Sequence, residues 1–271
     1  MAEELERDVL SFVMARWQES GGFGFAPTLP ASVEDTYHAL RILESIRPVS
    51  ENKLIFLMED SKLKTFLMKP EDKETWSIKT AYHYAFCCGL VGLASELSWL
   101  NHFLRKRLSQ SLNLTDQYYA ARAAKEWVPQ EGISLTEHTP VNWRSARELC
   151  MVLYLNGDNP ERFNETKADL VQWLQTCQNP DGGFGPLPGT TSFIENSHWC
   201  LKALALLGAG PLNWDTTNDF ILRCRTAGGG FARKNGAAPF LHSTWHAVAA
   251  LAVLSQMPRS RFYAPQEVPP P

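Results

Sequence analysis

The sequence predicts an all-α domain of about six repeats, each consisting of an outer and an inner helix. The first observation behind this prediction is a glycine-rich turn that ends in Phe and occurs three times, at residues 21–24, 182–185 and 228–232. The second is the apolar run after each turn, because the three runs align without gaps. Related runs begin at residues 33, 114, 194 and 241, and two further apolar helices fit between the first three.

The turn within 178–185 shows how a repeat is built. Pro180 cannot continue a helix, and Gly182 and Gly183 accept positive φ, so the chain turns here. Phe184 then supplies an apolar side chain just past the turn. The run 192–207 is apolar on most faces, which predicts an inner helix enclosed by other helices.

Apolar periodicity along the chain predicts about twelve helices and essentially no sheet. Ser32 is expected to cap the helix after it, with Asp35 in the first turn, and Ser192 and Glu195 repeat this arrangement. Residues 1–257 are expected to form one domain that closes into a ring, followed by a Pro-rich extended tail at 258–271. The segments predicted as helices are 4–17, 33–47, 53–68, 76–93, 94–110, 115–127, 142–155, 165–177, 192–207, 217–224 and 241–254, with a loop at 130–140.

Composition excludes several classes of protein. A net charge of −3 argues against a dedicated nucleic-acid surface. No apolar run approaches 20 residues, which predicts no membrane span, and the acidic start lacks the apolar core of a signal peptide. All six cysteines fall in helix-like segments without a C-x-x-C pair, which favours buried thiols in a reducing cytoplasm.

The Gly-Gly-Phe-Gly turn after an outer helix, followed by an inner helix with Ser or Thr near its start, resembles the prenyltransferase and squalene-cyclase repeat. This family includes the β subunits of protein prenyltransferases, squalene–hopene cyclases and the β domains of class II terpene cyclases. The likeness covers nearly the whole chain, and three repeats match the motif well. It implies an (α/α)6 toroid, an alpha-alpha barrel whose inner helices surround a central apolar cavity.

The zinc site of the prenyltransferase β subunits is not present as a motif. Those proteins hold zinc with an Asp-x-Cys at the start of one inner helix and a His at the next, and the zinc activates a thiolate. The matching positions here hold Phe193 and Glu195, and Ser243 stands at the His position with His242 one residue earlier. We therefore expect no bound metal and no other cofactor. A rearranged site that includes Glu195, His242 and a third group is the alternative.

The start of the helix at 33 resembles the acidic motif of the class II terpene cyclases. Those enzymes protonate an isoprenoid with the central acid of Asp-x-Asp-Asp, and Ser32-Val33-Glu34-Asp35 matches that register with Ser32 in place of the first Asp. The resemblance implies that Glu34 is the catalytic acid and that Asp35 helps to keep one carboxyl group protonated. The alternative is an ordinary helix start, because carboxylates favour the first turn.

Aromatic and polar side chains of the inner helices are the candidate substrate-binding residues. In the family such rings line the cavity and bind prenyl chains, although large rings also simply fill a core. His38, His83 and His246 also lie near helix starts, where a hydrogen-bonded core histidine is the commoner outcome. The substrate-binding candidates are Tyr37, Tyr82, Tyr118, Glu195, His198, Trp199, His242 and Trp245.

Three functions fit these patterns. The resemblance implies an isoprenoid-handling enzyme like a small class II terpene cyclase, which starts cyclisation of a prenyl chain by protonation. The second interpretation is a non-catalytic toroid that binds an isoprenoid or another apolar small molecule, or docks a partner. The third is a prenyltransferase β-like subunit that lacks the usual zinc site and needs a protein partner subunit.

Overall fold

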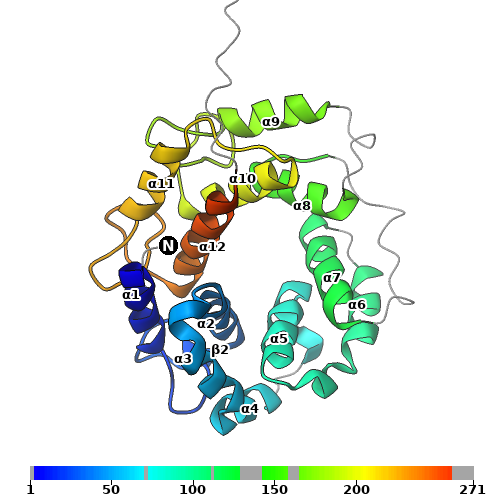
Figure 1. Ribbon diagram of the computed structural model, residues 1–271. Helices are drawn as coiled ribbons and strands as arrows, with labels where there is room; N and C mark the ends of the chain where they lie inside the picture. Colours follow the sequence, from blue (N-terminus) through cyan, green and yellow to red (C-terminus); the bar gives the residue numbers. More distant parts are fainter. Residues whose placement is uncertain (1–2, 70–72, 111–112, 129–141, 158–164, 258–271) are drawn as a thin grey trace, which may run out of the picture.

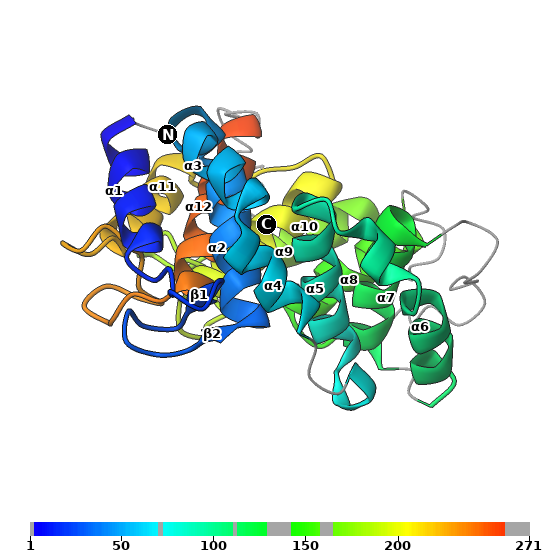
Figure 2. The same cartoon turned by 90° about the horizontal axis from the view of Figure 1, so that it is seen from below.

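The computed structural model describes residues 3–69, 73–110, 113–128, 142–157 and 165–257, and these ranges contain twelve α-helices. The helices form a ring of two layers, seen face-on in Figure 1 and from the side in Figure 2. The predicted all-α toroid is therefore confirmed. The predicted loop at 130–140 and the tail at 258–271 lie outside the described residues.

The inner layer consists of six helices that pack against one another in chain order, and the last packs against the first. Aromatic and aliphatic residues cover most faces of these helices, so each is buried on several sides, as predicted. The ring therefore closes through contact between the first and last repeats. The inner helices are α2 (Val33–Ser45), α5 (Ile78–Leu90), α7 (Leu114–Trp127), α8 (Ala146–Asn156), α10 (Ile194–Leu206) and α12 (Leu241–Gln256).

The outer helices bury one apolar stripe against the ring and expose the opposite face. In α11, for example, Thr217, Phe220 and Ile221 are buried. This spacing of three and four residues matches one face of a helix. The outer helices are α1 (Glu3–Met14), α3 (Arg47–Glu59), α4 (Ser61–Met68), α6 (Leu100–Leu108), α9 (Lys167–Thr176) and α11 (Trp214–Arg223), with short 3-10 helices at Lys73–Thr75 and Ala94–Leu97.

Three predicted segments differ from the structure. The segment 53–68 is two helices, because Asp60 Oδ1 accepts hydrogen bonds from the amides of Lys62 and Leu63 and starts a new helix. The segment 94–110 begins as a 3-10 helix and continues as α6. The helix expected from residue 142 starts at Ala146, where Ser145 is the N-cap.

The glycine-rich turns are fixed by a buried hydrogen bond that recurs in three repeats. The Phe of each turn is fully buried, and its amide donates to a hydroxyl one turn into the following inner helix. The pairs are Phe23 N with Thr36 Oγ1 at 3.0 Å, Phe184 N with Ser197 Oγ at 3.0 Å, and Phe231 N with Thr244 Oγ1 at 2.9 Å.

A glycine in each turn also lies against the backbone of the next outer helix. Gly182 has a φ of +89°, and a Cβ there would lie 2.0 Å from the Thr216 carbonyl oxygen in α11. Gly229, with a φ of +86°, faces the Asp8 carbonyl oxygen of α1 in the same way, at 2.4 Å. Asp8 also forms an ion pair with Arg225. The last turn therefore closes the ring on the first outer helix, and only glycine fits there.

One of the two predicted helix caps is confirmed. Ser32 is the N-cap of α2, and its Oγ accepts a hydrogen bond from the Asp35 amide at 3.0 Å. The expectation for Ser192 is wrong, because the N-cap of α10 is Phe193, which has no capping side chain. The Ser192 hydroxyl instead donates to Asp181 Oδ1 at 2.8 Å and holds the turn.

β-Structure in the described ranges is limited to one short ladder and isolated bridges. Strands β1 (Phe23–Gly24) and β2 (Ala31–Ser32) pair antiparallel across the first turn. Within the same ranges, no helix is both long and apolar enough to cross a membrane. All six cysteines are buried and free.

The repeated hydroxyl bond yields a stability prediction. We expect Ser197→Ala to lower the free energy of unfolding by about 1–3 kcal/mol, because the buried Phe184 amide loses its acceptor. Ser255→Ala is the matched control, since Ser255 is exposed and bonds only its own helix. Urea unfolding of both variants measures the difference. Equal stabilities would contradict a structural role for the Ser197 hydroxyl.

Candidate functional site: a cationic and aromatic cavity

The inner helices enclose a cavity of about 430 Å³. Its lining residues come from all six inner helices and from the loop that precedes α12, and most lie in the N-terminal halves of those helices. The volume is in the range of small-molecule sites. The lining residues are Tyr37, His38, Lys79, His83, Tyr118, Tyr119, Arg122, Arg147, Glu195, Asn196, Trp199, Lys202, Arg233, His242, Trp245 and His246.

Charge in the cavity is strongly unbalanced. Five lining side chains are lysine or arginine, and Glu195 is the one carboxylate among the lining residues. Arg233 Nε lies 3.4 Å from Glu195 Oε2, and Lys79 Nζ donates to Glu34 at the rim. The other three cations have no ion pair within the described residues. They are Arg122, Arg147 and Lys202.

These three unpaired cations stand on α7, α8 and α10, which are consecutive helices of the ring. Lys202 Nζ donates to the Tyr118 hydroxyl at 2.7 Å, and burial lowers the pKa of Lys202. The Arg122 guanidinium lies 4.5 Å from the centroid of the Tyr82 ring, and Arg147 lies 5.6 Å from that of Trp199. Cation–π contacts thus replace carboxylates as their partners.

The opposite side of the cavity, on α2, α5 and α12, is aromatic. Tyr37 stacks on His83 with ring centroids 3.9 Å apart and an angle of 7° between the planes. His38 and Trp245 pack beside this pair at 5.2 and 6.2 Å from Tyr37. These rings are buried and provide flat apolar surface for a ligand.

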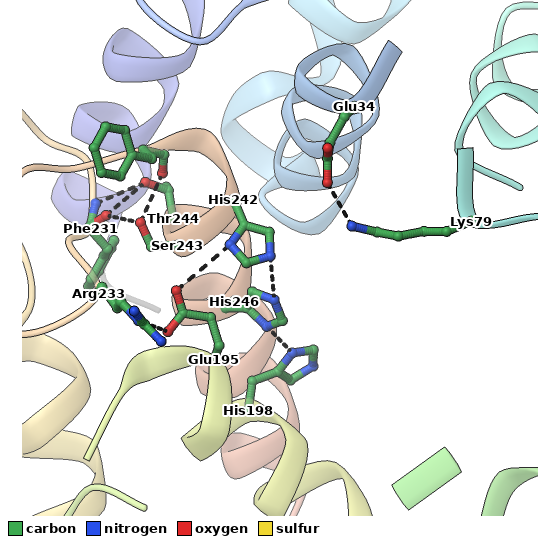
Figure 3. Close-up of polar contacts among 11 residues, drawn as sticks. Glu34, Lys79, Glu195, His198, Phe231, Arg233, His242, Ser243, Thr244 and His246 are labelled. Atoms are coloured by element: carbon green, nitrogen blue, oxygen red, sulfur yellow. Dashed lines mark hydrogen bonds and ion pairs between the residues drawn. The ribbon is translucent and has the colours of Figure 1, made fainter. Parts of the chain in front are cut away.

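Histidines of α10 and α12 form a chain with Glu195, shown in Figure 3. His198 Nδ1 lies 2.7 Å from His246 Nδ1, and His246 Nε2 lies 3.2 Å from His242 Nε2. His242 Nδ1 is 3.7 Å from Glu195 Oε1, an electrostatic contact rather than a hydrogen bond. The chain leads from the cavity mouth to the interior.

The protonation of this cluster follows from burial. Burial, with nearby cations, holds the pKa of His38, His83, His198 and His246 well below the ordinary value. The same causes lower the pKa of His242 to about 4. All five imidazoles are therefore neutral at neutral pH. Burial also raises the pKa of Glu195, although Arg233 opposes this effect.

Six of the ten candidate residues from the sequence line the cavity. They are Tyr37, Tyr118, Glu195, Trp199, His242 and Trp245. Tyr82 and His198 are buried behind this lining, where Tyr82 contacts Arg122 and His198 contacts His246. Glu34 and Asp35, the candidate acid and its neighbour, are not among the lining residues.

The environment of Glu34 differs from that of Glu195, although both occupy the same position of their repeats. The Glu34 side chain is 55% exposed, and its Oε1 accepts from Lys79 Nζ at 2.7 Å (Figure 3). Asp35 accepts a hydrogen bond from the Ser32 hydroxyl, and burial raises its pKa. A proton donor at Glu34 must break its ion pair, whereas Glu195 is 17% exposed and lines the cavity.

The sequence interpretation missed all five cations of the cavity. A signal for two of them was available, because Arg122 follows Tyr118 by four residues and Lys202 follows Trp199 by three. Residues with these spacings share a helix face, so a charge on the face of a cavity aromatic points to the same space. Arg233 lies in a loop, and its place in the cavity has no comparable signal.

The described ranges contain no group of three or more His, Cys, Asp or Glu side chains arranged to hold a metal ion. In particular, the histidines of the chain bond one another instead of converging on one point. The rearranged zinc site that the sequence left open therefore has no matching set of ligands in this part of the protein.

The fold and the site together define an α/α toroid with an aromatic and cationic ligand cavity. The family model of the prenyltransferase alpha-alpha toroid domain matches residues 1–193 and 194–265, so the chain belongs to this family. A search among curated proteins found no match.

The free energy of unfolding should fall steeply as the pH decreases below neutral. The four buried histidines His38, His83, His198 and His246 have folded-state pKa values below the ordinary 6.5, so the unfolded chain binds protons first as the pH falls. Their stabilising contribution is complete above pH 6.5 and is lost as the pH falls below it. Each histidine contributes up to about 1.4 kcal/mol per pH unit, so these four and His242, whose pKa is about 4, give roughly 6 kcal/mol per unit near pH 5.5. Burial raises the pKa of Glu195, so this group acts in the opposite direction.

Urea unfolding between pH 7.5 and 5.5 measures this slope. We expect His83→Phe to reduce the slope by about one proton, since phenylalanine can keep the stack on Tyr37 and cannot titrate. His102→Gln, on the exposed face of α6, is the control and should leave the slope unchanged. Stability that is constant over this pH range would contradict the assignment of neutral buried histidines.

Proposed function

We propose that the toroid binds an isoprenoid with an anionic headgroup in its central cavity. The observation that carries this proposal is a set of three cations, Arg122, Arg147 and Lys202, which line an aromatic cavity and form no ion pair in the part of the chain that the structure describes. A partly desolvated charge is costly unless an opposite charge or hydrogen-bond acceptors compensate it. Among the described lining residues Glu195 is the one carboxylate, which leaves an excess of positive charge for a ligand to balance.

The two sides of the cavity suit the two parts of such a ligand. Guanidinium groups and an ammonium group on α7, α8 and α10 fit a diphosphate or a similar polyanion. The rings on α2, α5 and α12 offer apolar surface for a prenyl chain, which is the ligand class that membership in the family favours. A neutral hydrocarbon would use only the second side.

Paired ligands test the proposal. We expect farnesyl diphosphate to bind more tightly than farnesol, and Arg122→Gln or Lys202→Met to weaken diphosphate binding by roughly tenfold or more, because each removes a charge-assisted contact. Affinity for farnesol should stay unchanged. Quenching of fluorescence from Trp199 and Trp245 in the cavity reports both ligands.

Arg105→Gln is the matched control for this experiment, because Arg105 is exposed on α6 and bonds Asn101 of the same helix. It should leave both affinities at the native value. Equal affinity of the native protein for the diphosphate and the alcohol would contradict an anionic headgroup as the preferred ligand feature.

A second candidate function is protonation-initiated cyclisation, which the position of Glu195 favours. Among the lining residues Glu195 is the one carboxyl group, and burial raises its pKa, as a general acid requires. The resemblance to the acidic motif selects Glu34 instead. The two carboxyl groups occupy equivalent repeat positions, which makes them a matched pair for mutation.

We expect Glu195→Gln to reduce any cyclisation of an olefinic isoprenoid by about 10²-fold or more, because glutamine cannot donate the initiating proton. Glu34→Gln should retain activity in this case. Product analysis by gas chromatography measures both. If Glu34→Gln loses the activity and Glu195→Gln keeps it, the acid is Glu34, as the sequence resemblance implies.

A further inference from the structure

The histidine chain has a property that ligand binding does not require. Glu195 lies at the outer end of the chain, beside His242, whose side chain is 46% exposed. His246 and His198 continue the chain inward and are buried. At its inner end, His198 packs against the rings of Trp199 and Trp245, at 5.9 and 5.1 Å between centroids. The four groups, drawn together in Figure 3, connect the cavity mouth with the protein interior.

A neutral imidazole has one N–H donor and one bare nitrogen acceptor. His246 uses both of its nitrogens in the chain, Nδ1 toward His198 and Nε2 toward His242. One of these contacts must therefore be donated and the other accepted. The tautomer of His246 fixes the tautomers of both neighbours, and the chain has two self-consistent directions.

Glu195 distinguishes the two directions. When Glu195 is ionised, His242 presents Nδ1–H to it and accepts at Nε2 from His246 Nε2–H, while His246 accepts at Nδ1 from His198 Nδ1–H. His198 Nε2 is then a bare base. When Glu195 is protonated, every donor reverses, and His198 Nε2 carries the proton.

Charged groups around the chain favour neutral imidazoles. Each cation lowers the pKa of the histidine that it faces, and the carboxylate of Glu34 opposes this effect at His242. The chain therefore changes direction by moving N–H protons, without storing an imidazolium ion. His198 faces Lys202, Arg41 and Arg122, and His246 faces His38 and Arg147. His242 faces Lys79, Glu34, Arg147 and Arg233. Glu195 faces Arg233.

We propose that Glu195, His242, His246 and His198 form a proton relay from the mouth of the cavity to the buried ring of His198, which lies behind the cavity lining. In the transfer step, a side-chain movement first closes the 3.7 Å between Glu195 Oε1 and His242 Nδ1 to hydrogen-bond distance. The Glu195 O–H bond then breaks and its proton forms N–H at His242 Nδ1. His242 passes its Nε2 proton to His246 Nε2, and His246 passes its Nδ1 proton to His198 Nδ1. His198 releases its Nε2 proton to a base beside its ring, a water molecule. One proton leaves Glu195, one reaches that base, and each histidine ends neutral.

The relay does not depend on which ligand occupies the cavity, so it goes beyond the proposed binding function. His198 Nε2 carries a proton and is an acid when Glu195 is protonated. It is a bare nitrogen and a base when Glu195 is ionised. His246 is its necessary link, because it alone contacts both other histidines through its two ring nitrogens.

Imidazole tautomers in the ligand-free, ¹⁵N-labelled protein test the relay. Two-bond ¹H–¹⁵N correlation spectra at pH 8 should show Nδ1–H for His198, Nε2–H for His246 and Nδ1–H for His242. Glu195→Ala removes the acceptor and leaves Arg233 facing His242 Nδ1, so all three tautomers should invert together. Inversion at His198, which does not contact Glu195, is the result that a local effect cannot produce.

Asp219→Ala is the matched control and should leave all three tautomers unchanged, because Asp219 is exposed on the outer helix α11 and is not among the charged groups that face the three histidines. His246→Leu breaks the chain between His242 and His198. In the His246→Leu background, Glu195→Ala should therefore no longer change the tautomer of His198. A His198 tautomer that is the same in the native protein and in Glu195→Ala would overturn the relay. The relay would also be overturned if the three histidine tautomers of the native protein matched neither of the two self-consistent arrangements.

Discussion

The structure depends on the hydrogen bond from the turn Phe amide to the hydroxyl of the following inner helix. This bond fixes the start of an inner helix relative to the turn before it, in three repeats with nearly the same length. The neighbouring glycine lets the same turn pack against the backbone of the next outer helix. Gly182 contacts Thr216, and Gly229 contacts Asp8. One local contact thus sets both layers of the ring, and the first turns of the inner helices converge on one space.

That convergence concentrates charge. Arg122 and Lys202 lie in the third turns of α7 and α10, and Arg147 lies in the first turn of α8. All three face the same cavity, although they are far apart in sequence. Their repulsion opposes folding, and the aromatic faces of Tyr82 and Trp199 compensate it in part. Charged residues that only keep a surface hydrated are expected on the outer layer of helices, where water and salt screen their repulsion. Their position in the ring centre is the physical reason for proposing an anionic ligand.

The repeat pattern predicted the fold because turn chemistry and helix periodicity are local properties of the sequence. The cavity lining was predictable where a residue type indicates its own burial, as for Tyr37, Tyr118 and Trp245, and where a polar residue stands at one recurring position of the repeat, as for Glu195 and His242. Glu34 and Glu195 could not be told apart, since their repeat positions are identical and their partners come from other repeats. Lys79 of α5 pairs with Glu34 at the rim, whereas Arg233 in the loop before α12 faces Glu195. Pairing of this kind depends on tertiary structure.

The cationic side and the histidine chain are physically linked. Lys202 and Arg122 lower the pKa of His198, after burial, which is the larger cause. An anion bound to these two cations cancels part of their field, so it raises the pKa of His198 and makes its Nε2 a stronger base. The same headgroup is proposed to contact Arg147, the cationic neighbour of His246, so it raises the pKa of His246 as well. A ligand headgroup on α7, α8 and α10 therefore shifts the proton affinity of the two inner histidines more than that of Glu195, which faces Arg233 at the mouth.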